Sequence, residues 1–265
     1  MAKKKDVQGK TALVTGASSG LGVDFAKELA KHGANLILVA RREERLKAVA
    51  EQIRQEFGVD VVVIPMGLAV PDAPQALYDR LKVENKSVDV LVNNAGYGLF
   101  GTFAELPWEK QKNMLDLDIV TLTHMTKLFV PDMVARKFGA VLQVASIAAY
   151  QPAPTYAAYA GAKSYVLSFS DALDHELRGT GVNVTTVSPG VTATEFLKVA
   201  GQKPTLYQRL VMMQSPEVAR QGVRALLHQR RSVVPGFFNA FSAFLMRFIP
   251  RRWMTVLAEA MMTIK

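Results

Sequence analysis

A buried strand, a glycine-rich turn and an amphipathic helix follow one another at the start of this chain. Residues 10–15 are apolar and β-branched, and apolar side chains return at helical spacing over 20–32. The turn between them reads Gly-Ala-Ser-Ser-Gly-Leu-Gly over 16–22. Because glycines let the backbone approach a ligand and a helix N-terminus presents free N–H groups, the arrangement predicts a binding site for the phosphates of a nucleotide.

Strand and helix patterns alternate along the rest of the chain. Strands are predicted at 10–15, 35–40, 59–65, 88–92, 139–145, 182–187 and 231–234. Helices are predicted near 20–32, 43–57, 72–85, 108–137, 154–179 and 216–229. Strands that alternate with helices form a parallel sheet covered on both faces. The prediction is an α/β fold with a Rossmann-like, doubly wound, seven-stranded parallel sheet, and residues 1–265 form a single domain because no linker or repeat marks a boundary.

One helical turn carries the strongest candidate for chemistry. Tyr159 and Lys163 are four residues apart, so they share one face of the helix predicted over 154–179. A free phenol titrates near pH ~10, and a neighbouring ammonium is expected to lower the pKa of Tyr159 and make it a better proton donor or acceptor. Ser146, at the end of a predicted strand, is expected to hydrogen-bond the same reacting oxygen. The three side chains suit proton exchange with an alcohol or a ketone.

These segments occur in the order and spacing of the short-chain dehydrogenase/reductase family. The chain resembles that family over residues 8–235 through Thr-Gly-Ala-Ser-Ser-Gly-Leu-Gly at 15–22, Asn-Asn-Ala-Gly at 93–96, Ser146, Tyr159-x-x-x-Lys163 and Ser-Pro-Gly at 188–190. The resemblance implies an oxidoreductase with a nicotinamide cofactor and with Ser146, Tyr159 and Lys163 as its catalytic residues. Besides Tyr159 and Lys163, it implies cofactor contacts from Gly16, Ser18, Ser19, Gly20, Leu21, Gly22, Asn93, Ala95, Gly96, Pro189, Gly190, Val191, and Thr192 or Thr194.

The end of the second predicted strand indicates which nicotinamide cofactor binds. An NAD enzyme usually has an acidic residue there for the ribose hydroxyls. This chain has Arg41 and Arg42 instead, with no acid before Glu43. A carboxylate would repel a 2′-phosphate, whereas a guanidinium pairs with it. NADP(H) is therefore expected in preference to NAD(H).

Two positions depart from the family pattern. Asp118 stands where the family usually has an Asn that completes a catalytic tetrad, and it is kept here as a fourth candidate catalytic residue. If the backbone at this position fills the role, Asp118→Asn should leave the reaction rate almost unchanged, and this is the expected outcome. If the carboxylate fills the role, Asp118→Asn should shift the pH–rate profile. Gly67 stands where an Asp usually binds the adenine amino group. Backbone contacts from Leu68 are then expected to hold the adenine, with somewhat weaker recognition.

Two regions are expected to shape substrate and partner binding. The resemblance makes residues 192–214 a mobile substrate lid. Residues 235–265 form an apolar and basic C-terminal extension that is rich in Phe and Arg. Burial of this extension against the core or a sister subunit is favoured over peripheral membrane contact, because such chains usually form symmetric homodimers or homotetramers.

Composition excludes several other classes of protein. The chain has no cysteine, which excludes disulfides and thiol chemistry. Its net charge of +9 is spread along the chain without a nucleic-acid-binding motif, so no nucleic-acid partner is expected. None of the four histidines stands at metal-ligand spacing, so no metal site is expected. No secretory signal follows the first residues, and a cytoplasmic location is expected.

Three functions remain open from the sequence. The first is an NADPH-dependent carbonyl reductase or secondary-alcohol dehydrogenase acting on an apolar substrate. The second is an isomerase or dehydratase with the same cofactor pocket. The third is a catalytically weak NADP-binding regulatory or membrane-associated protein. The intact Ser146, Tyr159 and Lys163 favour the first, and Asp118 is the feature that favours the third.

Overall fold

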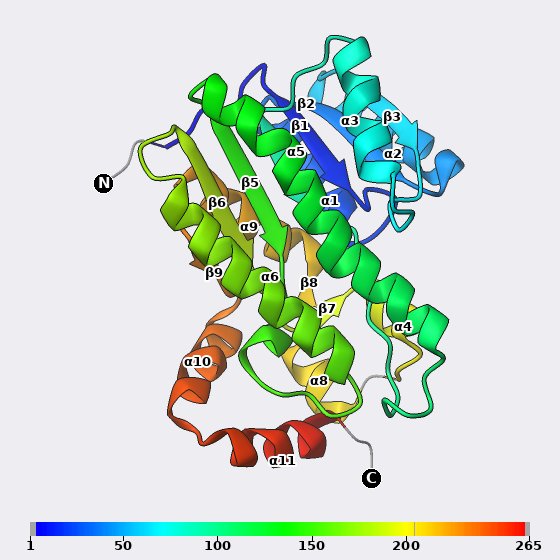
Figure 1. Cartoon of the computed structure of the whole chain (residues 1–265), viewed down its shortest axis with the longest axis vertical. Coiled ribbons are helices and arrows are strands. Elements are labelled where there is room, and N and C mark those ends of the chain that lie inside the picture. The colour runs from blue at the N-terminus through cyan, green and yellow to red at the C-terminus, as the bar shows by residue number, and fades with distance from the viewer. Residues whose placement is uncertain (1–3, 204, 263–265) are drawn as a thin grey trace.

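A parallel sheet runs through the centre of the protein in the computed structural model, which describes residues 4–203 and 205–262 (Figure 1). Its strand order is β3-β2-β1-β4-β5-β6-β9, and every neighbouring pair is parallel. The strands are β1 (Thr11–Thr15), β2 (Asn35–Ala40), β3 (Val61–Pro65), β4 (Val90–Asn93), β5 (Gly139–Val144), β6 (Val182–Val187) and β9 (Ser232–Val233). The predicted seven-stranded, doubly wound parallel sheet is confirmed.

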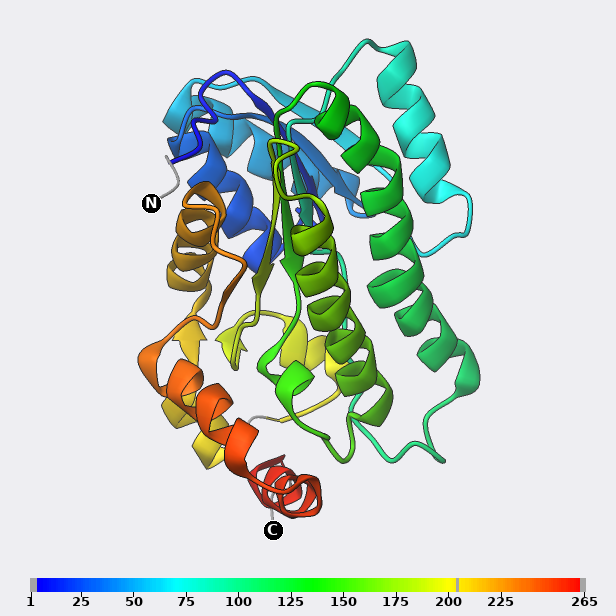
Figure 2. The same cartoon turned by 60° about the vertical axis from the view of Figure 1, so that its left-hand side comes forward.

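Helices cover both faces of the sheet (Figures 1 and 2). One face carries α1 (Leu21–Lys31), α2 (Glu43–Phe57) and α9 (Ser215–Leu227), and the other carries α3 (Ala73–Val83), α5 (Leu122–Ala135) and α6 (Ala157–Glu176). Successive strand residues point to opposite faces. Ala12 and Val14 of β1 therefore pack in the first core, while Leu13 packs in the second. Burial on both faces explains why the central strands are continuously apolar.

A π-helical turn interrupts the long helix that the sequence predicts over 108–137. α4 (Trp108–Leu115) continues through η1 (Asp116–Thr121) into α5. A π-turn inserts one residue into the helical ladder and often marks a functional site. Here it contains Asp118, whose side chain is fully buried.

The predicted lid and extension contain regular elements that the sequence did not predict. The lid holds β7 (Thr192–Ala193), α7 (Phe196–Ala200), α8 (Leu206–Val211) and β8 (Met213–Gln214), and β7 pairs with β8 in a small parallel sheet. The extension folds as α10 (Phe237–Leu245), a 3-10 turn η3 (Met246–Phe248) and α11 (Arg251–Met262). Among the described residues no helix has the length and apolar character that a membrane span requires. Residues 1–3, 204 and 263–265 of the predicted domain, lid and extension lie outside the described residues.

Candidate active site

The glycine turn lies where the sheet changes its winding direction. β1 lies between β2 and β4, so the chain winds outward from it both ways and leaves a crevice beyond the carboxyl ends of these strands. Gly16 has a φ of +67°, which favours glycine. A Cβ atom on Gly22 would lie 2.3 Å from the Gly16 carbonyl oxygen. The turn therefore excludes a side chain at Gly22 and keeps α1 close to the strand, as a phosphate-binding turn needs.

The segment after β4 is tied to the end of β1. The Thr15 hydroxyl accepts hydrogen bonds from the N–H groups of Asn94 and Ala95, both at 3.0 Å, and the Asn94 side chain donates to the Thr15 carbonyl. The buried Asn93 side chain donates instead to Thr126 and Gln143 in the core. The Asn93 side chain is thus held within the core, and the predicted cofactor contact of Asn93 stays a prediction. Asn94, which the sequence prediction missed, holds the crevice in shape.

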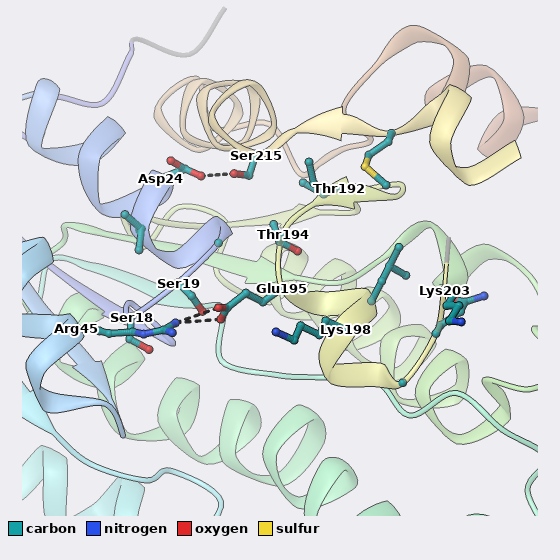
Figure 3. Close-up of a pocket in the computed structure, with 17 residues that line it drawn as sticks. Ser18, Ser19, Asp24, Arg45, Thr192, Thr194, Glu195, Lys198, Lys203 and Ser215 are labelled. Atoms are coloured by element: carbon teal, nitrogen blue, oxygen red, sulfur yellow. Dashed lines mark hydrogen bonds and ion pairs between the residues drawn. The ribbon is translucent and has the colours of Figure 1, made fainter. Parts of the chain in front are cut away.

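Several predicted cofactor residues line one open groove of about 1040 Å³ (Figure 3). They are Ser18, Ser19, Gly20, Thr192 and Thr194. A Cβ atom on Gly20 would lie 3.1 Å from the Thr194 side chain, so the glycine turn and the start of the lid face each other closely. Ser215 donates to Asp24 and joins α9 to α1 beside the groove (Figure 3). The glycine cradle and the helix N-terminus fit a dinucleotide pyrophosphate.

Three charged side chains meet at one end of this groove. Glu195 of the lid pairs with Arg42 at 3.1 Å and with Arg45 at 3.0 Å. Hydrogen bonds from Arg45 and Arg42 lower the pKa of the Glu195 carboxyl to about 2. Arg42 also donates to the hydroxyls of Ser18 and Ser19, at 3.2 and 2.6 Å. The arginines at this end of the groove therefore already bind a carboxylate of the lid. The same guanidinium groups are suited to bind a phosphate.

Arg41 and Gly67 lie next to each other. A Cβ atom on Gly67 would contact the Arg41 side chain at 3.5 Å. The missing side chain at position 67 therefore leaves room for the Arg41 stem. The Leu68 carbonyl accepts a hydrogen bond from Thr121 at 2.7 Å, which holds this loop against the π-turn. The predicted role of the Leu68 backbone in adenine binding stays a prediction.

The segment Pro189–Val191 passes close to the candidate catalytic residues. The Pro189 carbonyl accepts from the Ile147 N–H at 2.8 Å, and the Val191 carbonyl accepts from Met213 at 2.9 Å. A Cβ atom on Gly190 would lie 2.6 Å from the Asn239 side chain. α10 therefore packs directly on this segment, which connects the C-terminal extension to the site.

Ser146, Tyr159 and Lys163 come together at the end of β5. Ser146 follows β5 and begins the 3-10 turn η2 (Ile147–Tyr150), where its hydroxyl accepts from the Ala148 N–H at 3.1 Å. Tyr159 and Lys163 lie on α6, and the Lys163 Nζ is 5.6 Å from the Tyr159 ring centroid. Both side chains are buried. The structure thus assembles the three residues that the sequence singled out.

The Tyr159 phenol is buried in an electrostatic environment that disfavours its ionised form. Burial raises the pKa of Tyr159 well above its ordinary value, the charge of Asp118 raises it further, and a hydrogen bond with Ser146 lowers it. The expected lowering of this pKa by Lys163 is not met in this structure. Burial is the largest cause of the raised pKa, and the Asp118 carboxyl, which pairs with Lys163, adds to it.

Both carboxylate oxygens of Asp118 contact a neighbouring group, one through a hydrogen bond and the other through an ion pair. Oδ1 accepts from the Tyr97 N–H at 3.2 Å, and Oδ2 lies 3.2 Å from Lys163 Nζ, which also donates to the Val144 carbonyl at 3.1 Å. Burial raises the pKa of the Asp118 carboxyl, and Lys163 and the Tyr97 N–H lower it only in part. A Cβ atom on Gly96 would lie 2.5 Å from Asp118 Oδ1. The side chain itself, and not the backbone alone, is therefore built into the site.

Aromatic side chains from the lid and the loop after β4 cover Tyr159. Phe196 of α7 lies 5.5 Å from the Tyr159 ring, and Tyr156 lies 5.7 Å from it. Phe100 packs on Tyr156 at 5.5 Å, and the Tyr156 hydroxyl donates to Gln202 at 2.8 Å. The sequence prediction missed Tyr156, although it lies one turn before Tyr159 on the same helix. The cluster gives the reacting end of the site an apolar wall.

Comparison with known proteins identifies the family. The model of the short chain dehydrogenase family matches residues 10–205, and the chain belongs to this family. The short-chain dehydrogenases/reductases are NAD(P)-dependent oxidoreductases, and the fold and the Ser146–Tyr159–Lys163 group agree with that class. The catalytic and cofactor roles of individual residues remain predictions.

Individual relatives are similar over most of this chain. It is 35% identical over 225 residues to a short chain dehydrogenase of Pseudocercospora fijiensis, covering 79% of this chain and 70% of the relative. It is also 35% identical over 204 residues to the human very-long-chain 3-oxoacyl-CoA reductase, covering 75% of this chain but only 64% of that relative's length. A short-chain dehydrogenase from Sphingobium yanoikuyae, solved with NADPH, superposes with a TM-score of 0.80 at 29% identity, covering 91% of this chain and 97% of that one.

Proposed function

We propose that this protein is an NADPH-dependent reductase of ketones or aldehydes, or the corresponding secondary-alcohol dehydrogenase, and that it acts on an apolar substrate. The observation that carries the proposal is the group formed by buried Tyr159 and Lys163 with Ser146, which hydrogen-bonds to Tyr159, in a chain that also has an open groove lined by the glycine turn. The nicotinamide supplies or accepts the hydride when bound. The protein's own task is then to move one proton and to hold the substrate oxygen.

Each catalytic side chain has a distinct part in the proposed reaction. In the reducing direction the Tyr159 hydroxyl donates its proton to the carbonyl oxygen as that oxygen becomes an alcohol. Ser146 donates a hydrogen bond to the same oxygen and steadies it. Lys163, whose Nζ is 5.6 Å from the Tyr159 ring centroid, is held by Asp118 and the Val144 carbonyl and packs against the Tyr159 ring from the same helix. A positioned acid of this kind contributes about 10²–10⁴ in rate.

Two features support NADP(H) as the cofactor. Arg41 and Arg42 stand where an acidic residue would repel the 2′-phosphate. Arg42 already donates to the Glu195 carboxylate, and its other guanidinium N–H groups donate to the Ser18 and Ser19 hydroxyls, so the donor that a phosphate would use points into this end of the groove. The relative from Sphingobium yanoikuyae was solved with NADPH.

The wall of the site supports an apolar substrate. Phe196, Tyr156 and Phe100 surround Tyr159, and the apolar side chains Leu99 and Met114 belong to the same buried cluster. The name of the human relative points to a long acyl chain as its own substrate.

The alternative is a catalytically weak NADP-binding protein of the same fold. Asp118 favours it, because its charge raises the pKa of Tyr159. The assembled catalytic group favours the enzyme. A protein that only binds the cofactor needs no hydroxyl on Tyr159, so removal of that hydroxyl distinguishes the two.

Oxidation of NADPH with a panel of apolar ketones and aldehydes tests the proposal. Tyr159→Phe removes the proton donor and should lower turnover at least about a hundredfold, while NADPH still binds. Tyr165→Phe is the matched control, because Tyr165 is on the same helix but half-exposed and hydrogen-bonded to Thr123. Near-normal turnover of Tyr159→Phe, or no turnover by the unmodified protein with any substrate, contradicts the proposal.

A further inference from the structure

Large apolar side chains are exposed side by side on the two C-terminal helices. We call them the aromatic face: Phe237, Phe238, Phe241, Phe244, Leu245, Phe248, Trp253, Val256 and Leu257. Phe237 and Phe238 are 78% and 79% exposed. Neighbouring rings contact one another, with Phe237 stacked on Phe241 at 6.2 Å and Phe244 against Phe248 at 5.3 Å. The part of the sequence prediction that buried these side chains against the core is therefore wrong.

Both helices that carry the aromatic face are nevertheless packed against the rest of the protein on their other side. The opposite side of α10 is buried through Asn239 and Ala243, and Asn239 donates to the Pro235 carbonyl at 3.0 Å. Met254 and Ala258 bury the inner side of α11. Each helix thus has one side packed on the protein and an outer side that is also apolar. Exposing this many neighbouring apolar side chains to water is unfavourable. The aromatic face therefore indicates a binding partner.

The charges on this surface are basic. Arg247, Arg251 and Arg252 are exposed around the aromatic face, and Arg252 lies 5.8 Å from the Trp253 ring. α10 has no charged residue, and Glu259 is the sole acidic residue in 235–262. Aromatic rings bordered by arginines are the composition of helices that lie in the headgroup region of an anionic bilayer.

A second copy of this chain fits the surface less well. In a two-fold symmetric dimer the same patch faces its own copy, and this patch offers no acidic residue except Glu259 to the three arginines of the other copy. Like charges brought together at an interface oppose binding. An anionic lipid surface offers a negative charge to each of the three arginines and an apolar layer to the rings. The arginine stems can extend along that layer while their head groups stay with the phosphates.

The aromatic face also lies at the end of the molecule that carries the site. In Figures 1 and 2, α10 and α11 form the end toward which the strands of the central sheet point, on the same side as α8 of the lid. α10 contacts η2, which follows Ser146, and packs on Gly190 through Asn239. A surface that bound there would lie next to the lid.

We propose that the aromatic face is a docking surface for the headgroup region of an anionic phospholipid bilayer. The helices lie in the plane of the membrane surface, with the rings inserted and Arg247, Arg251 and Arg252 paired with lipid phosphates. The protein binds peripherally. Binding needs neither cofactor nor turnover, so its test is independent of the proposed enzyme activity.

Co-sedimentation of the full-length protein with phospholipid vesicles tests the proposal. The protein should sediment with vesicles of phosphatidylcholine and phosphatidylglycerol, bind less to phosphatidylcholine alone, and be released partly by salt. Phe237→Ser combined with Phe241→Ser should weaken binding about tenfold or more, because two inserted rings are lost. Arg251→Gln combined with Arg252→Gln should weaken binding to the anionic vesicles about fivefold for each arginine, with little effect on phosphatidylcholine.

A matched pair of tryptophans provides the control. Trp253 in the aromatic face is 56% exposed, and Trp108 at the start of α4 is 59% exposed. Trp253→Ser should weaken vesicle binding, whereas Trp108→Ser should bind as the unmodified protein does. Melting temperatures show that each variant is folded.

Three results overturn the proposal. The unmodified protein could remain in the supernatant with anionic vesicles, or Trp108→Ser and Trp253→Ser could weaken binding equally. In the third result the unmodified protein does not bind vesicles and is a dimer by light scattering. The combined Phe237→Ser and Phe241→Ser substitutions then convert this dimer into a monomer. In that case the aromatic face is an interface between two copies.

Discussion

Asp118 holds a carboxylate against the Lys163 ammonium where water does not reach. A carboxylate suits this place because Oδ1 accepts a hydrogen bond from the Tyr97 N–H while the negative charge on Oδ2 lies 3.2 Å from the Lys163 Nζ in an ion pair. An amide has only one oxygen, so an Asn here would direct its NH₂ group toward one of these two donors. The same charge raises the pKa of Tyr159. Asp118 therefore acts on the reaction through Tyr159 and is a positioning residue.

Asp118→Asn should move the pH–rate profile to lower pH. The substitution removes a negative charge that raises the pKa of Tyr159, so the phenol ionises at lower pH. In alcohol oxidation Tyr159 must be ionised, and the rise of the rate with pH should begin earlier. In ketone reduction it must be protonated, and the fall of the rate should begin earlier. The plateau should stay within about tenfold, since the proton donor is retained.

Asp116→Asn is the control for this measurement. Asp116 lies on the same π-turn but is partly exposed and pairs with Lys112. Its profile should superimpose on that of the unmodified protein. If the Asp118→Asn profile superimposes as well, the backbone of the π-turn carries the role, as the sequence alone had led us to expect.

Single residues were predictable where a motif sets both their type and their spacing. The i, i+4 spacing places Tyr159 and Lys163 on one helix face, and Ser146 closely follows β5, which ends at Val144, so the three were found from the sequence. The direction of the Asn93 side chain was not predictable, because it depends on Thr126 and Gln143, which lie on other elements. The ion pair of Asp118 likewise depends on how the π-turn approaches α6.

Glu195 links the lid to the arginines at the end of the groove. Its carboxyl has a pKa of about 2, so it is ionised, and the ion pairs persist, throughout the working pH range. The contact lies on the surface and contributes little to stability. It nevertheless places a negative charge where Arg42 would bind a 2′-phosphate. If Arg42 binds the 2′-phosphate as proposed, the lid competes with that phosphate for Arg42.

Glu195→Gln should lower the KM for NADPH about two- to fivefold, in keeping with the strength of an exposed ion pair. The KM for NADH should change less, because NADH has no 2′-phosphate. Steady-state kinetics with both cofactors measures the difference. Glu217→Gln is the control, since Glu217 has a similarly lowered pKa of about 2 beside Arg220 on α9. An equal fall of both KM values would indicate easier opening of the lid and contradict competition for Arg42.

Elements were predictable where one face or both faces are buried. The strands over 35–40 and 182–187 and the helix over 43–57 have the predicted bounds. The lid and the extension were not divided into elements, because their helices are short and α10 is apolar on nearly every side. The π-turn was invisible for a different reason: Asp116–Thr121 keeps helical spacing, and only the packing against α6 reveals the extra residue.

At the scale of the whole molecule, the two faces of the sheet and the crevice at its carboxyl edge follow from the alternation of strands and helices. Parallel strands with helical crossovers have few alternative arrangements, which is why a doubly wound parallel sheet could be expected from one sequence. The outer surface has no such constraint. The aromatic face and the open groove are formed by side chains whose exposure is known only once the chain is folded. The partners that bind there are therefore not set by the alternation of strands and helices.

Cofactor binding should therefore be visible in the stability of the whole molecule. A ligand that binds only the folded protein raises the melting temperature according to its concentration relative to its Kd. For a chain of this size each tenfold difference in affinity corresponds to about 3–6 °C. At equal concentrations NADPH should thus raise the melting temperature more than NADH, and removal of NADPH by gel filtration should restore the lower value.

Arg41→Ala should abolish most of that difference. A guanidinium that pairs with a phosphate contributes about 1.5–3 kcal/mol, or roughly ten- to a hundredfold in affinity. The melting temperature with NADPH should fall toward that with NADH, and the value with NADH should stay the same. Arg80→Ala is the control, because Arg80 is an exposed arginine on α3 that pairs with Glu84 at 2.8 Å, away from the groove. If Arg41→Ala lowers the shifts with both cofactors equally, Arg41 does not bind the 2′-phosphate, and the proposed preference for NADP(H) loses one of the two arginines that support it.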